Sequence, residues 1–574
     1  MALIARREPA AGAEAWAWPE DCHPVLRGIY ARRDIGSPGE LELTLSALRP
    51  VGEFDSLGAA VDLLLRHREH RIVIFGDFDA DGATSSALMV LCLKDLGFTD
   101  VGFFVPDRFE LGYGLTPEAV ERIDKPTPEL IVTVDNGISS VQGVALAREL
   151  GIDVLVTDHH LAGKELPQAN AIVNPNLAGD VFAGKHLAGV GVAFYVLAAL
   201  GRALGQAGAV ARYLDLVALG TMADVVHLDQ SNRILINEGL RRLRAGQCRP
   251  GLRALCEVAG LSLQDLRSTS LAYQIAPRLN AAGRLDDMAV GVRCLLSDSA
   301  AEALELARKL DSLNRERRVI EAQMRAEAVE LVESSETLAE EALPGVVCLH
   351  RQDWHEGIVG LVASRLKDRY HRPVIAFAST ETGALKGSAR SVAGFHVRDA
   401  LAEVDAAHPG LIERFGGHAM AAGLTLAEAS FEEFSAAVQR VADRHLSPEL
   451  LKGEVLTDGE LPAEHLTVEV AELLRDAGPW GQGFPEPSFD GLFELIDHRI
   501  VGQSHLKMKV RERASGRTLG AIAFNHGDCD YATGDVLHLV YRLCVDDYGP
   551  RPLAQLIVEH VFASAELGSE GHPG

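Results

Sequence analysis

The chain has 574 residues, with 55 Lys and Arg against 81 Asp and Glu, so its formal net charge is -26. This length allows about three or four domains with large cores. The 8 cysteines form no C-x-x-C pair, which argues against a zinc site or a disulfide framework. The longest apolar stretch, 187–201, is too short to span a bilayer, and the sequence begins with no signal-peptide pattern. We therefore expect a cytoplasmic protein with no membrane partner.

The acidic balance argues against a simple nucleic-acid-binding protein, because basic surfaces dominate the binding of nucleic acids. A channel lined by a few arginines and divalent cations could still hold a polyanion. In that case the affinity should be weak and should depend strongly on salt and metal.

The N-terminal part shows little periodicity, and a strand–loop–helix pattern follows it. Residues 1–45 combine Pro, Gly and mixed charge, and we expect an arm packed on the first domain. From about residue 55, short apolar runs occur at 72–75, 130–134, 154–157 and 171–173. Alternation of such runs with helical segments predicts a parallel sheet flanked by helices.

Three acids follow the first predicted strand at alternate positions: Asp77, Asp79 and Asp81. Alternate side chains of an extended chain share one face. Open α/β sheets bind ligands at the carboxyl ends of their strands, and hard oxygen ligands suit Mg²⁺ or Mn²⁺. An acidic turn with Asp81 capping the next helix is the alternative, and for an isolated motif it would be favoured by roughly two to one.

The residues at the ends of the next two predicted strands favour a metal site over an acidic turn. Asp135 follows the run at 130–134, and Asp158, His159 and His160 follow the run at 154–157. A buried core histidine explains either His alone, but two in tandem after Asp favour metal ligands. Asp224 lies in an apolar setting, where a metal or an Arg partner is about equally plausible.

Four segments resemble, in order, the four motifs of the DHH phosphoesterase superfamily: Asp77–Gly82, Val134–Gly137, Asp158–His160 and Gly220–Asp224. The resemblance implies two divalent metal ions, Mn²⁺ or Mg²⁺, with Asp77, Asp79, Asp135, His159 and Asp224 as ligands. It implies that Asp135 bridges the two ions and that Asp158 orients His159. His160 would contact the scissile phosphate.

A helix without Pro or Gly is predicted over about 300–332, and its charges fit a solvated connecting helix. A second α/β pattern then starts at residue 345. It carries three segments in which glycines accompany His, Ser or Arg: 354–360, 387–391 and 415–419. Each alone could be an ordinary turn, although such glycines let the backbone approach a phosphate. Together they resemble the DHHA1 domain, which implies that His418, Gly416 and Gly417 approach the scissile phosphate.

The C-terminal part of the chain, from about residue 450, predicts a small β-barrel. A rigid link at 479–487 precedes four short alternating runs, at 493–496, 506–511, 518–524 and 536–543. Lys507, Lys509 and Arg511 share one strand face, which suits either a nucleic-acid backbone or plain solvent.

The domain order resembles the bacterial single-strand-specific exonucleases of the superfamily. Their pattern differs at three positions, His227, Trp480 and Phe484. The resemblance implies a metal-dependent 5′→3′ exonuclease that acts on single-stranded DNA in repair and recombination and releases nucleoside 5′-monophosphates. It also implies a single-strand-binding protein and a RecQ-type helicase as partners.

The same resemblance assigns residues to the substrate. Arg108 would bind the terminal 5′ phosphate together with Ser388 and Arg390, and Tyr113 would stack on a base. An ion pair with a neighbouring acid is the default alternative for Arg108. Four further residues are expected to contact the strand: Arg278, Asn280, Arg284 and His355.

The predicted fold class is α/β, with two α/β domains joined by a long helix and a C-terminal OB-like β-barrel. The expected boundaries are 1–45 for the arm, 46–295 for the DHH domain, 296–335 for the connecting helix, 336–445 for DHHA1, 446–565 for the barrel and 566–574 for a flexible tail. Two other functions stay open. One is a phosphodiesterase for short oligonucleotides or cyclic dinucleotides, and the other is a non-catalytic DNA-binding scaffold.

Overall fold

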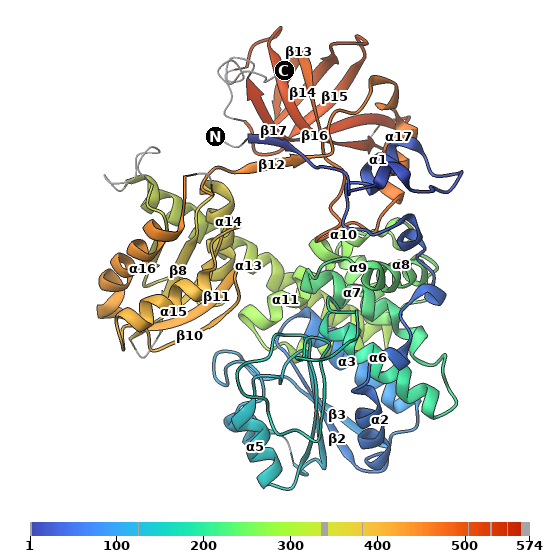
Figure 1. Cartoon of the computed structure of the whole chain (residues 1–574), viewed down its shortest axis with the longest axis vertical. Coiled ribbons are helices and arrows are strands. Elements are labelled where there is room, and N and C mark those ends of the chain that lie inside the picture. Colours follow the sequence, from blue (N-terminus) through green and yellow to red (C-terminus); the bar gives the residue numbers. More distant parts are fainter. Residues whose placement is uncertain are drawn as a thin grey trace. The chain divides into compact units, whose positions relative to one another are not determined.

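The computed structural model describes residues 3–123, 125–334, 343–380, 383–448, 450–502, 504–527, 531–547 and 549–563 (Figure 1). Their contacts form two compact units. The first unit described here contains residues 4–279, 288–308 and the described residues from 456 onward, and the second contains residue 3, residues 280–287 and the described residues of 309–455. The predicted tail, 566–574, lies outside the described residues.

A five-stranded parallel sheet forms the base of the first unit. Its strands stand in the order β3-β2-β4-β5-β6: β2 (Arg71–Gly76), β3 (Asp100–Phe104), β4 (Leu130–Val134), β5 (Asp153–Thr157) and β6 (Ala171–Val173). The four strands predicted from apolar runs are confirmed. The edge strand β3 was not predicted, because Asp100 and Gly102 interrupt its apolar pattern.

Helices cover both faces of this sheet (Figure 1). On one face α4 and α5 contribute to a core with Phe75 and Val154, and on the other α3 packs against α6 and α7. The bounds are α2 (Leu57–Arg66), α3 (Ala80–Asp95), α4 (Pro117–Arg122), α5 (Val141–Glu149), α6 (Gly189–Ala203), α7 (Leu214–Asp224) and α8 (Gln230–Arg244). Because α3 lies between the sheet and other helices, it is buried almost all round and shows little amphipathic pattern.

A run of further helices follows: α9 (Pro250–Val258), α10 (Ser268–Ser270), a π-helical turn (Leu271–Ile275), α11 (Ala276–Leu285), α12 (Ala289–Leu296) and α13 (Ala300–Ser334). The long helix α13 confirms the predicted connecting helix. Part of its apolar surface is buried, including Ala307, Leu310 and Ala328, whereas Val319 is 67% exposed. Among the described residues, no helix combines the length and the apolar character that a membrane crossing would require.

The second unit is built on a mixed five-stranded sheet in the order β10-β11-β9-β8-β7. Only β7 and β8 are parallel, and the other neighbours are antiparallel. Its elements are β7 (Val347–Arg351), α14 (Val359–Tyr370), β8 (Val374–Ser379), β9 (Ala384–Arg390), α15 (Val397–Ala407), β10 (Arg414–Gly417), β11 (Ala421–Ala427) and α16 (Phe431–His445). Phe377 and Phe434 meet edge to face in its core, with ring centroids 5.7 Å apart.

Five strands close into a barrel in the order β13-β14-β15-β17-β16. They are β13 (Phe489–Val501), β14 (His505–Glu512), β15 (Thr518–Ala523), β16 (Val536–Asp546) and β17 (Leu553–Ala563), and α17 (Val468–Asp476) precedes them. The predicted barrel is confirmed, although β17 was missed. Arg511 forms an ion pair with Glu494 at 3.1 Å, and Lys509 stands opposite Asp497 on the neighbouring strand. Lys507, however, stands opposite Arg499, so the face is only partly charge-balanced and keeps an excess of positive charge.

The N-terminal arm contacts the barrel as well as the first domain, which corrects the predicted docking. Its strand β1 (Leu3–Arg6) pairs with β12 (Glu454–Thr457), and α1 (Pro24–Tyr30) follows. The buried Arg33 guanidinium donates two hydrogen bonds, of 2.6 and 3.0 Å, to the Asp458 carboxylate. The later part of the arm reaches the parallel-sheet domain, where Asn237 donates a hydrogen bond to the Leu43 carbonyl.

The three residues that depart from the superfamily pattern lie in one cluster. The rings of Trp480 and Phe484 stack at 5.2 Å, and the buried Arg233 guanidinium lies 4.3 Å from the Phe484 ring centroid. Gly483 leaves room for His227, because a Cβ at this glycine would lie 2.1 Å from the imidazole ring. These contacts join the segment that leads into the barrel to the parallel-sheet domain.

Replacing the buried Asp490 by Asn should destabilise the barrel. Its carboxylate accepts hydrogen bonds from Arg6 at 2.8 Å, Thr457 at 2.6 Å and His538 at 3.0 Å. Although burial opposes this, these partners hold the pKa of Asp490 well below its usual range. We expect a loss of about 2 to 3 kcal/mol in the free energy of unfolding at pH 7, measured by urea unfolding.

This loss should depend on pH in one direction. A depressed folded-state pKa contributes stability that is present above the unfolded value of about 3.9 and is lost as the pH falls below it. The difference between the wild type and Asp490→Asn should therefore stay constant down to about pH 5 and shrink toward pH 3. Asp497→Asn, on the exposed face of the same strand, is the control. An equal loss in both variants would contradict the assignment.

Candidate active site

The carboxyl ends of β2, β4 and β5 bring the predicted metal ligands together. Three groups have ligand atoms that all lie within 4.8 Å of one another: Asp77, Asp79 and Asp135; Asp135, His159 and His160; and Asp81, His159 and Asp224. Asp135 and His159 each belong to two of these groups. A carboxylate that bridges two cations would have to occupy such a shared position.

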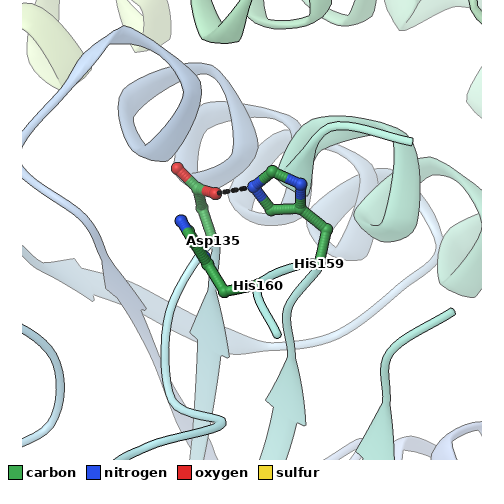
Figure 2. A group of neighbouring side chains, drawn as sticks. All are labelled: Asp135, His159 and His160. Carbon is green, nitrogen blue, oxygen red and sulfur yellow. Dashed lines mark ion pairs between the residues drawn. The ribbon is translucent and has the colours of Figure 1, made fainter. Parts of the chain in front are cut away.

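Three buried polar atoms in this cluster face one another. His159 Nε2 lies 3.2 Å from Asp135 Oδ1 and 3.4 Å from Asp224 Oδ2, and Figure 2 shows the first contact as a dashed line. Among the described residues, none of the three atoms has a hydrogen-bond partner. Because unpaired buried polar atoms are costly, and because carboxylate and imidazole suit Mn²⁺ and Mg²⁺, the donor set fits a divalent cation.

The electrostatics of the cluster also fit a cation. Burial raises the pKa of Asp77 and Asp135, and repulsion from neighbouring carboxylates adds to this shift. Burial also raises the pKa of Asp224, while it lowers the pKa of His159. Without a cation, the carboxylates of the cluster therefore favour their neutral, protonated form. A divalent cation would favour the ionised carboxylates instead.

Asp79, and not Asp81, caps helix α3. The Asp79 carboxylate accepts a hydrogen bond from Gly82 N at 2.9 Å, which corrects the alternative in which Asp81 is the cap. The fully buried Asp81 instead accepts hydrogen bonds from Gly189 N at 2.7 Å and Val190 N at 3.1 Å. It thereby ties the start of α6 to the metal centre.

The backbone around Asp135 is unusual. Asp135 has a left-handed φ of 62°, a conformation that is costly for most residues and is often found at functional sites. Gly189 leaves space for it, because a Cβ at this glycine would lie 2.5 Å from the Asp135 Cβ. The neighbouring Asn136 donates hydrogen bonds to the carbonyls of Phe75 and Val134, which ties β2 to β4.

Asp158 binds the ring of His160, and not that of His159 as predicted. Its Oδ1 lies 2.7 Å from His160 Nδ1 and accepts hydrogen bonds from the backbone N–H groups of His159 and His160. Its Oδ2 accepts from Ile138 N at 2.9 Å. Although burial opposes it, this carboxylate raises the pKa of His160 to about 9. The tandem order in the chain cannot distinguish which ring the carboxylate reaches.

Arg108 and Tyr113 lie beside the cluster. The Arg108 guanidinium lies 4.6 Å from the Phe78 ring centroid, and Tyr113 meets the same ring edge to face. The Tyr113 hydroxyl lies 3.4 Å from His160 Nδ1, and 45% of the residue is exposed. An exposed aromatic ring and a planar cation thus border the metal centre.

Helix α11 carries three of the residues that were predicted to contact the strand. Arg278 donates a hydrogen bond to the Gln274 carbonyl one turn earlier. Within the second unit, Arg284 donates to the Gly357 carbonyl at 3.0 Å, and Gly357 N donates to His355 Nδ1 at 3.0 Å. Asn280 lies one turn before Arg284 on α11, so their side chains share a helix face.

Three of the remaining predicted residues lie on strands of the second unit: Ser388 and Arg390 on β9, and Gly416 on β10. Arg390 donates a hydrogen bond to Ser388 Oγ at 3.0 Å. Ser388 pairs with Gly423, which pairs with Gly416, so the three form one row across β9, β11 and β10. Because Gly423 and Gly416 have no side chains, the backbone of this row is uncovered on the strands next to Ser388 and Arg390.

The turn between β10 and β11 contains the other two. Gly417 has a φ of 138°, a conformation that favours glycine. His418 N donates a hydrogen bond to the Ala421 carbonyl at 2.8 Å, and this bond closes the turn.

The structure therefore gathers the predicted residues in two groups, each within its own unit. In the first unit, the five predicted metal ligands meet Asp158, His160, Arg108 and Tyr113. The second group holds the residues of α11 from Asn280 onward together with those of the DHHA1-like sheet. Sequence reasoning missed Asp81, Gly189 and Phe78 as site residues. The alternating acids signalled Asp81, but Gly189 approaches Asp135 only through the fold.

Three family models match the chain. The model of the DHH family, N-terminal domain, matches residues 71–221, the DHHA1 domain matches 343–443, and the RecJ OB domain matches 457–560. Together they cover the parallel-sheet domain, the mixed-sheet domain and the barrel.

Curated and solved relatives agree with these matches. The single-stranded-DNA-specific exonuclease RecJ of Salmonella typhimurium is 49% identical over 573 residues, which cover 97% of this chain and 99% of that protein. The RecJ of Bacillus subtilis is 37% identical over 505 residues, with 87% of this chain and 62% of that protein covered.

A solved structure of RecJ from Thermus thermophilus in complex with Mn²⁺ is similar along almost the whole chain. It has a TM-score of 0.81 at 31% identity and covers 98% of this chain and 79% of that one. A second structure of the same protein, in complex with Mg²⁺, has a TM-score of 0.76 at 30% identity and covers 97% and 78%. With its three domains matched and a relative 49% identical over nearly the full length of both proteins, this chain belongs to the RecJ family of DHH phosphoesterases.

Proposed function

We propose that the chain is a metal-dependent 5′→3′ exonuclease that hydrolyses single-stranded DNA and releases nucleoside 5′-monophosphates. The observation that carries this proposal is the convergence of Asp135 Oδ1, His159 Nε2 and Asp224 Oδ2, which are buried without hydrogen-bond partners among the described residues. The names of the relatives supply the substrate class, and the Mn²⁺ and Mg²⁺ complexes of the Thermus protein support the choice of cations.

Five residues would hold two divalent cations, Mn²⁺ or Mg²⁺: Asp77, Asp79, Asp135, His159 and Asp224. Bound there, the cations supply Lewis-acid chemistry, which activates water and neutralises charge on the phosphodiester. Asp135 would be the shared ligand, because it is the carboxylate that belongs to two of the three clusters. Asp81 positions the start of α6, and Gly189 there leaves room for the Asp135 side chain.

His160 is the residue that we assign to the scissile phosphate. Its ring is fixed by the hydrogen bond to Asp158, which is itself anchored by Ile138 N. A ring held in this way contacts the phosphate without losing rotational freedom at each turnover. We assign His418 and the backbone of Gly416 and Gly417 to the same phosphate, as the family resemblance implies.

Recognition of the 5′ end is assigned to arginines. Arg108, Ser388 and Arg390 would bind the terminal phosphate, because a guanidinium is a planar bidentate donor. The contact of Arg390 with Ser388 supports joint action of that pair. Tyr113 would stack on a base, since its exposed ring lies beside the metal cluster. Along the strand, the contacts would come from Arg278, Asn280, Arg284 and His355.

The biological setting follows from the family. We propose a role in DNA repair and recombination in the cytoplasm, with a single-strand-binding protein and a RecQ-type helicase as partners. The domain boundaries given above are proposed in the same way, with catalytic residues in the domains at 46–295 and 336–445.

End-labelled DNA tests the proposed activity. A single-stranded substrate of about 30 nucleotides labelled at its 5′ end should release labelled mononucleotide at once in the presence of Mn²⁺. The same strand labelled at its 3′ end should shorten gradually, and neither reaction should proceed with EDTA. Long strands that stay intact while dinucleotides are cleaved would refute the proposal and favour a phosphodiesterase for short oligonucleotides.

A further inference from the structure

A pocket with an interior of about 50 Å³ lies in the first unit, away from the metal ligands. It is lined by the C-terminal half of α8, the start of α10 and the segment that leads into the barrel. Its floor contains the buried Leu240 and Trp480. Three arginines contribute to its walls: Arg244, Arg267 and Arg475. A concentration of arginines is notable in a chain with a net charge of -26.

The two carboxylates at this pocket already have cationic partners. Asp476 forms an ion pair with Arg475 at 2.9 Å, and Glu486 forms one with Arg542 at 2.5 Å. Asp476 and Arg475 therefore balance each other, whereas Arg542 also forms an ion pair with Glu559 at 2.9 Å. Asp476 in addition attracts the Arg244 guanidinium from beyond ion-pair distance.

The other two arginines form no ion pair within the described part of the chain. Arg244 Nε donates a hydrogen bond to the Leu266 carbonyl at 2.8 Å, which leaves most of its guanidinium unengaged. Among the described residues, no carboxylate lies within 4.0 Å of the Arg244 or Arg267 guanidinium. The two therefore present positive charge to the same pocket, which an anion would neutralise.

The pocket is held in shape by hydrogen bonds beneath it. Ser268 Oγ accepts a hydrogen bond from Trp480 N at 3.2 Å and donates one to the Trp480 carbonyl at 2.9 Å. Trp480 Nε1 donates to the Leu474 carbonyl at 3.0 Å. These bonds fix the linker against α10, so the site needs little rearrangement before it binds.

We propose that Arg244 and Arg267 bind a backbone phosphate of single-stranded DNA at this pocket, separately from the metal centre. This inference rests on the proposed function, which supplies the polyanion. A guanidinium fork matches phosphate oxygens, and the small interior suits one phosphate group. A peptide would need an open strand edge or an apolar groove, whereas the buried Trp480 closes the floor.

The position of the pocket predicts a dependence on strand length. Helix α8 begins shortly after the metal ligand Asp224 and reaches Arg244 after 15 residues, which is about 20 Å along a helix. A strand stacked as in a duplex needs about six nucleotides for this distance, at roughly 3.4 Å per nucleotide, and an extended single strand needs fewer. Longer substrates should therefore use the pocket, and shorter substrates should not reach it.

The double variant Arg244→Gln/Arg267→Gln tests this proposal by steady-state kinetics. For a strand of about 30 nucleotides at low salt, KM should rise about tenfold with kcat unchanged, because one phosphate contact is lost. The slope of log KM against log salt should fall by about 0.7. For a dinucleotide, which is too short to reach the pocket, both constants should stay at their wild-type values. Arg241→Gln is the matched control, because Arg241 lies on the same helix but is paired with Glu238 at 2.7 Å.

The outcomes separate this proposal from the proposed function. If the double variant changed KM equally for both strand lengths, or for neither, the pocket assignment would be overturned. The wild type would still be an exonuclease in that case. A wild type inactive on every strand would refute the function itself. If the double variant does not fold, Arg267→Gln alone should raise KM for the long strand about threefold. Wild-type DNA kinetics together with loss of binding to a short polyglutamate would reassign the pocket to an acidic peptide.

Discussion

Asp135→Asn should abolish exonuclease activity while the chain stays folded. The substitution removes the charge of the residue that two ligand clusters share. Asn has the same shape and tolerates the left-handed φ of 62° at this position, so the backbone is not disturbed. We expect kcat on single-stranded DNA to fall by about 10³-fold or more, measured in the presence of saturating Mn²⁺.

A second readout distinguishes loss of a ligand from loss of structure. Burial and neighbouring carboxylates raise the pKa of Asp135, so the metal-free cluster is destabilised by repulsion. The neutral amide should therefore leave the Tm of the metal-free protein unchanged or higher, and should remove the increase in Tm that Mn²⁺ causes. Asp100→Asn, at the exposed start of the edge strand β3, is the control. A folded Asp135→Asn variant with wild-type kcat would exclude this centre from the reaction.

Gly189→Ala should have the second-largest effect, although this residue carries no functional group. A Cβ at Gly189 would lie 2.5 Å from the Asp135 Cβ and 2.6 Å from Asp135 Oδ1. Either the start of α6 or the Asp135 carboxylate must therefore move. Because displacements near 1 Å in a catalytic group cost about 10²-fold in rate, we expect a loss of that size in kcat. Overpacking should also lower the free energy of unfolding by about 1 to 3 kcal/mol.

Gly191→Ala provides a matched control on the same helix. Its added Cβ would meet the Leu187 side chain at 3.1 Å, and that side chain can adjust. Its activity should stay within about threefold of the wild type, since no ligand is displaced. If Gly189→Ala and Gly191→Ala lost activity equally, the effect would come from α6 as a whole and not from the contact with Asp135.

Much of the fold could be predicted because local patterns and tertiary structure agree. Apolar runs indicate β2, β4, β5 and β6, and the polar residues that follow three of these strands converge as the parallel sheet requires. The edge strand β3 escapes this reasoning, because one side of an edge strand needs no partner and tolerates Asp100 and Gly102.

The finer contacts of the site depend on distances that local patterns do not contain. Whether Asp158 reaches the ring of His159 or of His160 depends on the turn after β5, and the structure selects His160. Capping is a local signal and so suggests Asp81 as a helix cap, whereas its partners Gly189 and Val190 lie far along the chain. Close approaches of this kind become visible only once the chain is folded.

The other functions that the sequence left open are not favoured. A non-catalytic scaffold would need no complete set of metal ligands, and here all five predicted ligands lie in clusters of metal-binding size. A phosphodiesterase for short substrates is disfavoured by the match of residues 457–560 to the RecJ OB domain and by the full-length RecJ relatives.

The central claim is that the Asp and His cluster holds two divalent cations on which activity depends. The most direct measurement is a titration of metal-free protein with Mn²⁺, followed by electron paramagnetic resonance of the free ion. We predict two bound Mn²⁺ per chain in the wild type, loss of at least one in Asp135→Asn, and exonuclease activity that rises with occupancy. Activity at full strength without bound metal, or equal binding by the wild type and Asp135→Asn, would contradict the account.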